Sequence, residues 1–280
     1  MALVLVLGVM AVITLIALTF TRATTTRVQV ARSIVDQAKA EALADAGAAR
    51  AIALLEAEPA GAGGASLRSF AFELGEGRVE VALRNEGGLV DLNAASLELV
   101  QGLLLVLGLA PDEARRLAER IGDFRDPDHA RHARGAEDED YAAAGMAQGA
   151  LDGPLRDESD LLGVLGMSGE LYRRLRPHVT VFSGTDTVDP TAATREVLLA
   201  VPGLGAPGAA LWLAAQRHPG ALEPPVPDTA WSYLQPGLGL AWRIQARATL
   251  RNGATFLREA VVSVDGPAAY SIRAWRMGPE

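Results

Sequence analysis

The sequence contains no cysteine, few aromatic residues and an excess of acidic over basic residues. Without cysteine, disulfide bonds and metal sites built from thiolates are excluded. Aromatic residues make up only 5% of the 280 residues, so Leu, Val and Ala must supply most of the core. The 26 Lys and Arg against 34 Asp and Glu give a formal net charge of -8. This charge disfavours a nucleic-acid partner, because phosphate binding depends on clustered Lys and Arg.

Residues 1–21 carry no charged side chain and are dense in Leu, Val, Ile and Ala. Roughly 20 apolar residues in a helix span the hydrocarbon core of a bilayer, which is about 30 Å thick. A cleaved secretory signal would instead begin with basic residues and end at a small-residue cleavage site. We therefore expect a transmembrane helix over residues 1–21, with a buried core helix as the alternative.

The basic residues near this segment leave its orientation open. No Lys or Arg precedes it, whereas four follow it, namely Arg22, Arg27, Arg32 and Lys39. The positive-inside rule alone would place the body of the protein in the cytoplasm. A basic leader ahead of Met1, removed on processing, would reverse that orientation.

Residues 22–58 are expected to continue the helix, because Ala, Leu and Glu are strong helix formers and no proline occurs before Pro59. A stripe of mostly small residues follows one side of this segment and widens near its end: Val30, Ile34, Ala38, Ala42, Ala49, Ile52 and Leu55. The simplest interpretation is one long rod, half in lipid and half amphipathic.

Alternating apolar and polar residues predict antiparallel strands over residues 66–91 and 240–280. Phe70, Phe72 and Leu74 alternate before a Gly75-Glu76-Gly77 turn, which is typical of a hairpin. Residues 242–250 alternate before Asn252-Gly253, a pair that favours a tight hairpin turn. Residues 256–264 and 270–275 have the character of two further strands.

Between these strands, residues 92–225 have the period and the capping residues of helices. The expected helix starts are Asn93, Pro111, Ser168 and Asp189. Two stretches, 91–121 and 189–217, each have the pattern of a helix, a Gly-containing turn and a second helix. The sequence thus predicts an α+β fold in which a large, mostly α-helical domain interrupts a sheet.

Several short motifs follow one another in an order that is specific. They are GGLVDLNAAS, DFRDPD, GAEDEDY, ESDLLGVLGMSGELYRRLRPHVTV and DPTAATREVLL. Together with the apolar N-terminus, they resemble the general secretion pathway protein K family, the K-type minor pseudopilins of bacterial type II secretion. The resemblance implies a pilin-like transmembrane and long helix packed on an antiparallel sheet. A domain like a SAM or helix-hairpin-helix domain would be inserted between the strands.

The resemblance also implies function, partners and location. Such a subunit is not an enzyme and binds no nucleic acid. It joins the I-type and J-type minor pseudopilins at the tip of the pseudopilus, initiates assembly and supports secretion across the outer membrane. It is a single-pass protein of the bacterial inner membrane with its body in the periplasm, where it meets lipid and the secretion platform. A prepilin peptidase removes its leader, and its N-terminus is methylated.

The N-terminus carries the processing features that this resemblance implies. Mature numbering would begin at Met1, so the position where most pilin-like subunits carry Glu is Leu5. A buried Glu would need the N-terminal amine of a neighbour to offset its charge in lipid. A subunit without that Glu makes no such demand on a subunit above it, as expected at a tip.

An acidic cluster is the main candidate for a binding site. Asp123, Asp126 and Asp128 precede a loop, and residues 137–140 follow it. Calcium takes six to eight oxygen ligands, although the spacing is not that of an EF-hand because no Gly occupies the sharp turn. Composition alone favours a solvated acidic loop. The family resemblance implies a calcium site, with these candidate ligands: Asp126, Asp128, Glu137, Asp138 and Asp140.

Other motifs offer weaker alternatives. His129 and His132 have a spacing that zinc accepts on a helix, but Pro127 favours a loop there. Residues 203–208 match G-x-G-x-x-G without the strands that a dinucleotide site needs. The same region resembles a helix-hairpin-helix, so a membrane-anchored DNA-binding protein of a DNA-uptake system is the alternative function. The chain contains no nucleophile elbow or Walker loop.

Overall fold

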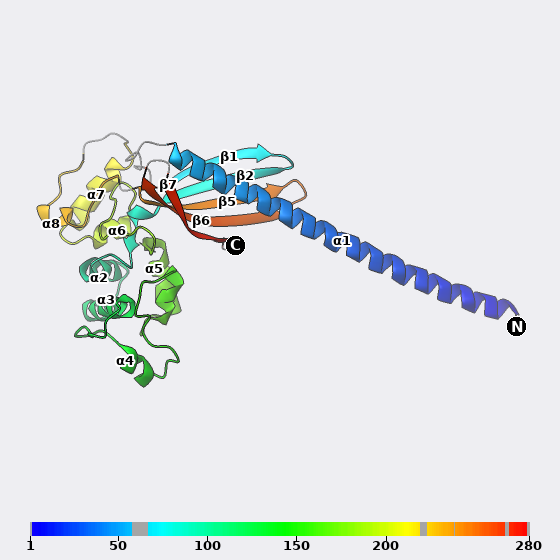
Figure 1. Cartoon of the computed structure of the whole chain (residues 1–280), viewed down its shortest axis with the longest axis horizontal. Coiled ribbons are helices and arrows are strands. Elements are labelled where there is room, and N and C mark those ends of the chain that lie inside the picture. Colours follow the sequence, from blue (N-terminus) through cyan, green and yellow to red (C-terminus); the bar gives the residue numbers. More distant parts are fainter. Residues whose placement is uncertain (1, 58–66, 219–222, 238, 267–268, 279–280) are drawn as a thin grey trace.

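The computed structural model describes residues 2–57, 67–218, 223–237, 239–266 and 269–278. A long helical rod, a sheet lying along part of it and a helical body beyond the sheet make up the molecule (Figure 1). The predicted combination of helices with an antiparallel sheet is confirmed. The SAM-like or helix-hairpin-helix-like character of the helical body is not confirmed and stays a prediction.

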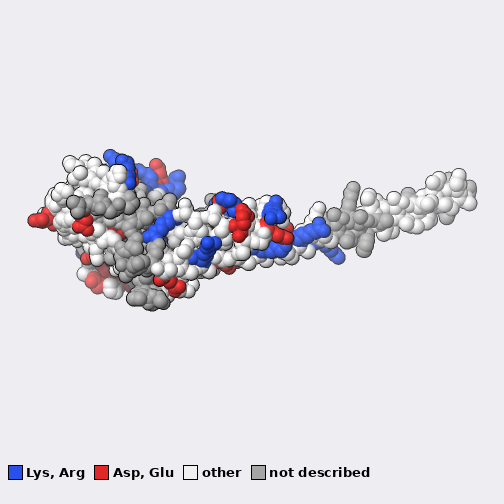
Figure 2. All heavy atoms as spheres, turned by 90° about the horizontal axis from the view of Figure 1, so that it is seen from above, with Lys and Arg blue, Asp and Glu red and all other residues white. Residues whose placement is uncertain are grey.

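The rod is one helix, α1 (Ala2–Glu56), which runs without a break because no proline interrupts it. Its N-terminal half extends away from the rest of the molecule, and its outermost part carries no charged side chain (Figures 1 and 2). Within the described part of the chain, no helix combines the length and the apolar character that a membrane crossing requires. The transmembrane helix predicted over residues 1–21 is therefore not confirmed. Met1 lies outside the described residues, and the side chain of Leu5 does so as well.

The sheet has five antiparallel strands in the order β1-β2-β5-β6-β7. Both predicted hairpins are present, with Leu74 paired to Gly77 across one turn and Thr249 to Thr255 across the other. Gly75 and Gly253 adopt positive φ in these turns, a conformation that glycine reaches without strain. The strands are β1 (Leu67–Leu74), β2 (Gly77–Asn85), β5 (Ala241–Leu250), β6 (Thr255–Gly266) and β7 (Ala269–Met277).

The C-terminal half of α1 packs on one face of this sheet through alanine and glycine. Ala40, Ala44, Ala48 and Ala51 are all 0% exposed and pack against the alternate residues of β2 and β5. A Cβ added to Gly47 would lie 2.6 Å from Cγ1 of Val79, so only glycine lets the helix approach this closely. Small side chains therefore set the short distance between the rod and the sheet.

Most of the stripe of small residues along α1 does not pack on the sheet. Ile52 and Leu55 are buried. The other five members are exposed, because the face that packs is the one that includes Gly47: Val30, Ile34, Ala38, Ala42 and Ala49. Alanine occurs on several sides of this helix, so its positions alone do not identify the packed side.

The residues between β2 and β5 form the helical body, which has a hydrophobic core of its own around Leu99, Leu103, Leu198 and Trp212. Two short strands, β3 (Val90–Asp91) and β4 (Val179–Thr180), pair in parallel within it. Its α-helices are α2 (Leu97–Val106), α3 (Pro111–Arg125), α4 (Asp138–Ala143), α5 (Gly169–Leu175), α6 (Arg195–Ala200), α7 (Gly205–Ala215) and α8 (Asp228–Trp231). Its 3-10 helices are η1 (Glu86–Gly88), η2 (Glu158–Gly163) and η3 (Arg176–His178).

Two of the four predicted helix starts are correct. Pro111 is the first residue of α3, and the hydroxyl of Ser168 caps α5 by accepting a hydrogen bond from the Leu171 N–H. The start predicted at Asn93 is wrong, because Ser96 caps α2. The Asn93 side chain instead bonds the backbone of Leu155, a residue distant in the sequence.

The start predicted at Asp189 is also wrong, since Thr194 caps α6. The Asp189 carboxylate is fully buried and accepts hydrogen bonds from Thr191 and from the Asn85 side chain. Asp and Asn bond nearby backbone groups in turns as readily as at helix starts. A local pattern therefore could not separate these two roles.

Gly102 provides a test of the packing inside the helical body. A Cβ at this position would lie 2.2 Å from the backbone oxygen of Ala200, where α2 crosses α6. We expect Gly102→Ala to lower the free energy of unfolding by about 1–3 kcal/mol through overpacking. At Gly169, where nothing lies within 4 Å of such a Cβ, the same change should be neutral or stabilise by up to about 1 kcal/mol. Urea unfolding of both variants measures this, and an unchanged midpoint for Gly102→Ala would contradict it.

Candidate functional site

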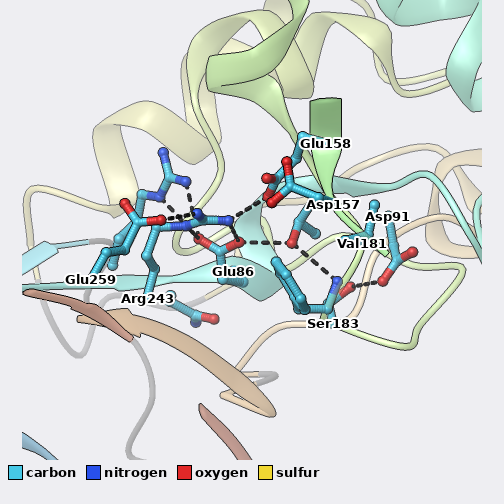
Figure 3. Close-up of polar contacts among 12 residues, drawn as sticks. Glu86, Asp91, Asp157, Glu158, Val181, Ser183, Arg243 and Glu259 are labelled. Carbon is cyan, nitrogen blue, oxygen red and sulfur yellow. Dashed lines mark hydrogen bonds and ion pairs between the residues drawn. The ribbon is translucent and has the colours of Figure 1, made fainter. Parts of the chain in front are cut away.

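A buried arginine joins the sheet to the helical body. Arg243 lies on β5, and only 7% of its side chain is exposed. Its Nε and Nη2 each lie 3.0 Å from an oxygen of Glu86, and its Nη1 lies 2.9 Å from Oε1 of Glu259. Nη2 also donates to Glu158, so carboxylates from η1, β6 and η2 converge on one guanidinium (Figure 3).

Further polar groups complete this Arg243 network. Arg276 on β7 donates to Glu259 at 2.7 Å and also to Asp157. The hydroxyl of Thr180 donates to Glu86 at 2.7 Å. Buried charges of this kind are stable only when they are paired and hydrogen-bonded. The network therefore holds the body and the sheet in one relative position.

The pKa values of the network carboxylates reflect this pairing. Burial raises the pKa of Glu86, but the adjacent guanidinium of Arg243 outweighs it and lowers the pKa below its usual value. Burial alone would raise the pKa of Asp157. Hydrogen bonds from Ser159 and Arg276 to the ionised carboxylate outweigh burial, so the pKa falls to about 2. Groups with depressed pKa values stabilise the fold above their ordinary pKa, and that stability is lost as the pH falls.

A second set of acidic groups lies at the far end of the helical body and is not paired in this way. Two clusters bring ligand atoms within 4.8 Å of one another. One contains Asp123, Asp126 and His132, and the other contains His129, Glu137 and Asp152. The first cluster is partly neutralised, because Nδ1 of His132 bonds Asp123.

Several oxygens of these clusters are buried without a hydrogen-bond partner among the described residues: Oδ1 of Asp126, both Oε atoms of Glu137 and Oδ1 of Asp152. Burial, with the charges of Asp123, Asp126 and Asp152, raises the pKa of Glu137 above its usual value. Burial and the neighbouring Asp128 likewise raise the pKa of Asp126. Unpaired carboxylates that face one another destabilise the fold when ionised, and a bound cation would remove that penalty.

The structure separates the five predicted calcium ligands. Asp126 and Glu137 belong to the two clusters, one to each. Asp128, Asp138 and Asp140 lie outside them and accept hydrogen bonds. Asp128 accepts from the Ala130 N–H, Asp138 from the Ala150 N–H, and Asp140 from the Glu137 N–H and Arg131.

Sequence reasoning missed Asp152. It stands well beyond the acidic stretch, in a loop that Asp138 ties back to α4 through the Ala150 N–H. The positive φ of 50° at Asp152, unusual for a residue other than glycine, is a structural sign with no counterpart in the sequence pattern. The proximity of Asp152 to His129 and Glu137 is therefore evident only from the folded structure.

The oxygen-rich donor set fits a hard cation such as calcium better than zinc. Zinc favours nitrogen and sulfur ligands, and His129 and His132 fall in different clusters. Asp126, Glu137 and Asp152 offer unpartnered carboxylate oxygens, the ligand type that calcium prefers. The residues present therefore fit calcium.

The glycine-rich segment 203–208 does not have the surroundings of a dinucleotide site. It follows helix α6, whereas the dinucleotide motif follows a strand. Gly203 and Gly205 adopt positive φ at the turn between α6 and α7. The buried Trp212 on α7 belongs to the core of the helical body, so this helix pair contributes to packing.

Comparisons with known proteins agree on one family. Residues 81–184 match the family model described as type II secretion system (T2SS), protein K. Type II secretion system protein K of Pectobacterium carotovorum subsp. carotovorum is 36% identical over 77 residues, or 28% of this chain and 24% of that protein. The protein of the same name from Dickeya chrysanthemi is 33% identical over 84 residues, or 30% of this chain and 23% of that protein. The matches thus span about a quarter of the length of these relatives.

A solved structure shares the fold over nearly the whole chain. It is a chain of the GspK-GspI-GspJ complex from the type 2 secretion system of enterotoxigenic Escherichia coli. The TM-score is 0.67 at 21% identity, and the match covers 92% of this chain and 99% of that one. The likeness therefore extends to the rod, the sheet and the helical body.

Arg243→Met tests the network at the junction. The change leaves buried carboxylates without their partner, so we expect it to lower the free energy of unfolding by about 3–5 kcal/mol. The difference from the unchanged protein should shrink as the pH falls below 4.5, the ordinary pKa of Glu, because Glu86 and Glu259, whose pKa values Arg243 helps to lower, then protonate.

Arg78→Met is the matched control, because Arg78 pairs with Glu80 on the exposed face of β2. It should cost less than about 1 kcal/mol. Denaturant unfolding at several pH values measures both variants. Equal losses in the two, or a loss at Arg243 that does not change with pH, would contradict the role given to the network.

The segment matched by the family model includes β3, α2, α3, both acidic clusters and the 3-10 helix that carries Glu158. Four of the five sequence motifs also lie in this segment, and DPTAATREVLL follows it. Over residues 81–184 this chain therefore matches the family of type II secretion system protein K, which is also the family that its motifs resemble.

Proposed function

We propose that this chain is a minor pseudopilin, without enzymatic activity, at the tip of the pseudopilus of a type II secretion system. It joins the I-type and J-type minor pseudopilins, initiates assembly of the pseudopilus and supports protein secretion across the outer membrane. The observation that carries this proposal is the likeness in fold, over 92% of this chain, to a chain of the GspK-GspI-GspJ complex.

Exposed apolar residues on the rod support contact with other pilin-like subunits. Val28, Val30, Ile34 and Val35 lie on α1 beyond the uncharged segment and are 45–65% exposed. Val30 and Ile34, four positions apart, lie on one side of the helix, and Val28 and Val35, seven apart, lie on the other. Isolated exposed apolar residues are common, but two on the same side of a projecting helix present one apolar surface to a partner. A neighbouring rod with apolar residues at matching positions would remove them from water, as in coiled helices.

The position of the helical body supports a place at the tip. The body lies at the end of the molecule opposite the N-terminus (Figure 1). A subunit stacked above this one in a filament would collide with it. Leu5, in the place of the usual Glu, removes the electrostatic need for such a subunit.

The N-terminal segment fits the same proposal. Residues 1–21 would anchor the subunit in the inner membrane by a single pass, with the body in the periplasm. A prepilin peptidase would release Met1 as the mature N-terminus, which would then be methylated. The rod would leave the membrane through the secretion platform as the pseudopilus assembles.

We further propose that the acidic clusters bind calcium, with Asp126, Glu137 and Asp152 as ligands. Calcium would supply positive charge where these carboxylates repel one another. Asp126 follows α3, Glu137 precedes α4 and Asp152 lies in the loop beyond α4, so a cation held by these residues would join the three segments. The role of calcium is therefore structural.

The DNA-uptake alternative has less support. The comparisons name secretion proteins and no nucleic-acid-binding protein among the relatives described above. The net charge of -8 opposes phosphate binding.

Co-purification tests the proposed assembly. When co-expressed with I-type and J-type pseudopilins and extracted in detergent, the full chain should elute with both. Val30→Gln with Ile34→Gln should weaken this complex about tenfold or more, because two exposed apolar contacts are lost. Gln37→Ala, an exposed polar position on the same helix, is the control and should leave the complex intact. The proposal fails if the full chain elutes alone, or if it forms long homopolymers without the other two subunits.

Thermal unfolding tests the calcium site. At a calcium concentration about 100 times the dissociation constant, we expect about 2.7 kcal/mol of added stability. Glu137→Gln should abolish this gain and should raise stability in the absence of calcium, because it removes an unpaired buried charge. Glu139→Gln, an exposed neighbour outside both clusters, should behave as the unchanged protein. No response to millimolar calcium, or an undiminished response in Glu137→Gln, would exclude the site.

A further inference from the structure

A hollow of about 370 Å³ lies where the sheet meets the helical body, on the face of the sheet that α1 does not cover. Its walls come from strands β2, β5 and β6 and from the helical elements η2, α5 and η3. Charged side chains dominate the lining: Arg84, Arg173, Arg176, Arg243, Glu158 and Glu259. The Arg243 network therefore forms one wall of the hollow.

The charges deep in the hollow are already paired, and those at its rim are not. Glu158 and Glu259 both bond Arg243, and Arg84 bonds Glu86. Arg173 and Arg176 are exposed. Among the described contacts neither guanidinium meets a carboxylate, and Arg173 donates only to the Gly169 oxygen. The chain as a whole carries a net charge of -8. Two arginines without an acidic partner therefore make the edge of this hollow locally positive.

A second hollow of about 470 Å³ adjoins the first along the open face of the sheet. The two share Ala82 and Gln245, so they form one elongated depression, which we call the arginine groove. Ala71 and Ala82 leave room above the strands, and Phe70, Val81 and Leu257 supply apolar contacts. Arg247 and Glu80 also line this hollow, and Glu80 is already paired with Arg78. Small side chains with apolar neighbours are suited to a main chain laid across the strands.

We propose that the arginine groove binds an extended acidic peptide segment of a protein partner, with an Asp or Glu carboxylate held by Arg173 and Arg176. These two arginines are three positions apart at the junction of α5 and η3, a spacing that places side chains on one side of a helix. The guanidinium fork matches a carboxylate with paired, charge-assisted hydrogen bonds. The rest of the segment lies over Ala82 and against Leu257.

The length of the groove favours a peptide over a small anion. An isolated phosphate would use the arginine end alone and would leave the larger hollow without a role. The site is also distinct from the surfaces assigned above. Helix α1 packs on the face of the sheet opposite the groove. The acidic clusters lie on other elements of the helical body.

A labelled peptide tests the proposal directly. The probe is a fluorescein-labelled octapeptide of alternating glutamate with alanine or serine, and the full chain in detergent is titrated against it by fluorescence anisotropy. Replacing its glutamates with glutamine should weaken binding about tenfold or more, because the charge-assisted hydrogen bonds are lost. Raising the salt concentration should weaken it as well.

Two sets of variants locate the site. Arg173→Glu with Arg176→Glu should weaken binding of the acidic peptide about tenfold or more, through lost pairing and added repulsion. Arg174→Glu is the matched control, since Arg174 is exposed on the same helix but does not line the groove. It should change the dissociation constant less than about twofold. Circular dichroism of the double variant and of the Arg174→Glu control checks that both proteins fold.

The remaining outcomes decide against the groove. No binding of the acidic peptide, equal binding of its glutamine form, or an equal loss in Arg174→Glu each overturns the proposal. Inorganic phosphate that displaces the peptide at equal concentration identifies a small-anion site and overturns the peptide assignment. If the I-type and J-type subunits fail to co-purify while the peptide still binds, the proposed function falls and the groove stands.

Discussion

The guanidinium of Arg243 is the interaction on which the arrangement of this molecule depends. It projects from the sheet and holds carboxylates from β6, from η1 at the entrance to the helical body and from η2 within that body. Removing any one partner leaves a buried charge without compensation, which costs more than the pair contributes when intact. The position of the guanidinium is consequently fixed by carboxylates from three different elements. Two bodies with separate hydrophobic cores can therefore behave as one unit.

The junction of the rod with the sheet rests on a different kind of contact. Alanine and glycine bring α1 close to β2 and β5, and charged groups enter only at the margin, where Arg258 lies 2.7 Å from Glu41 and 2.5 Å from Asp45. Dispersion between closely spaced small groups accumulates over many atoms. The rod is thus held to the sheet while its exposed apolar residues stay available to neighbours.

The sequence predicted the hairpins and the helix starts at Pro111 and Ser168 because those features depend on neighbours within a few residues. It failed at Asn93 and Asp189, whose side chains bond residues distant in the sequence. It also failed to identify the packed side of α1, because alanine gives little contrast between faces. Arg243 and Glu158 showed no local pattern, and Asp152 could be connected to Glu137 only through folding. Apart from the packed side of α1, these failures concern polar groups that meet partners distant in the sequence.

The same comparison of charges separates structural sites from binding sites in this protein. In the Arg243 network each carboxylate meets a guanidinium, and the pKa values of Glu86, Asp157 and Glu259 are lowered. In the acidic clusters carboxylates meet one another, and the pKa values of Asp126 and Glu137 are raised. A folded chain keeps such buried, unmatched carboxylates at a cost in stability, which a bound cation would offset. Arg173 and Arg176 at the groove are exposed and carry no such cost, and the proposed acidic partner would match them by charge complementarity.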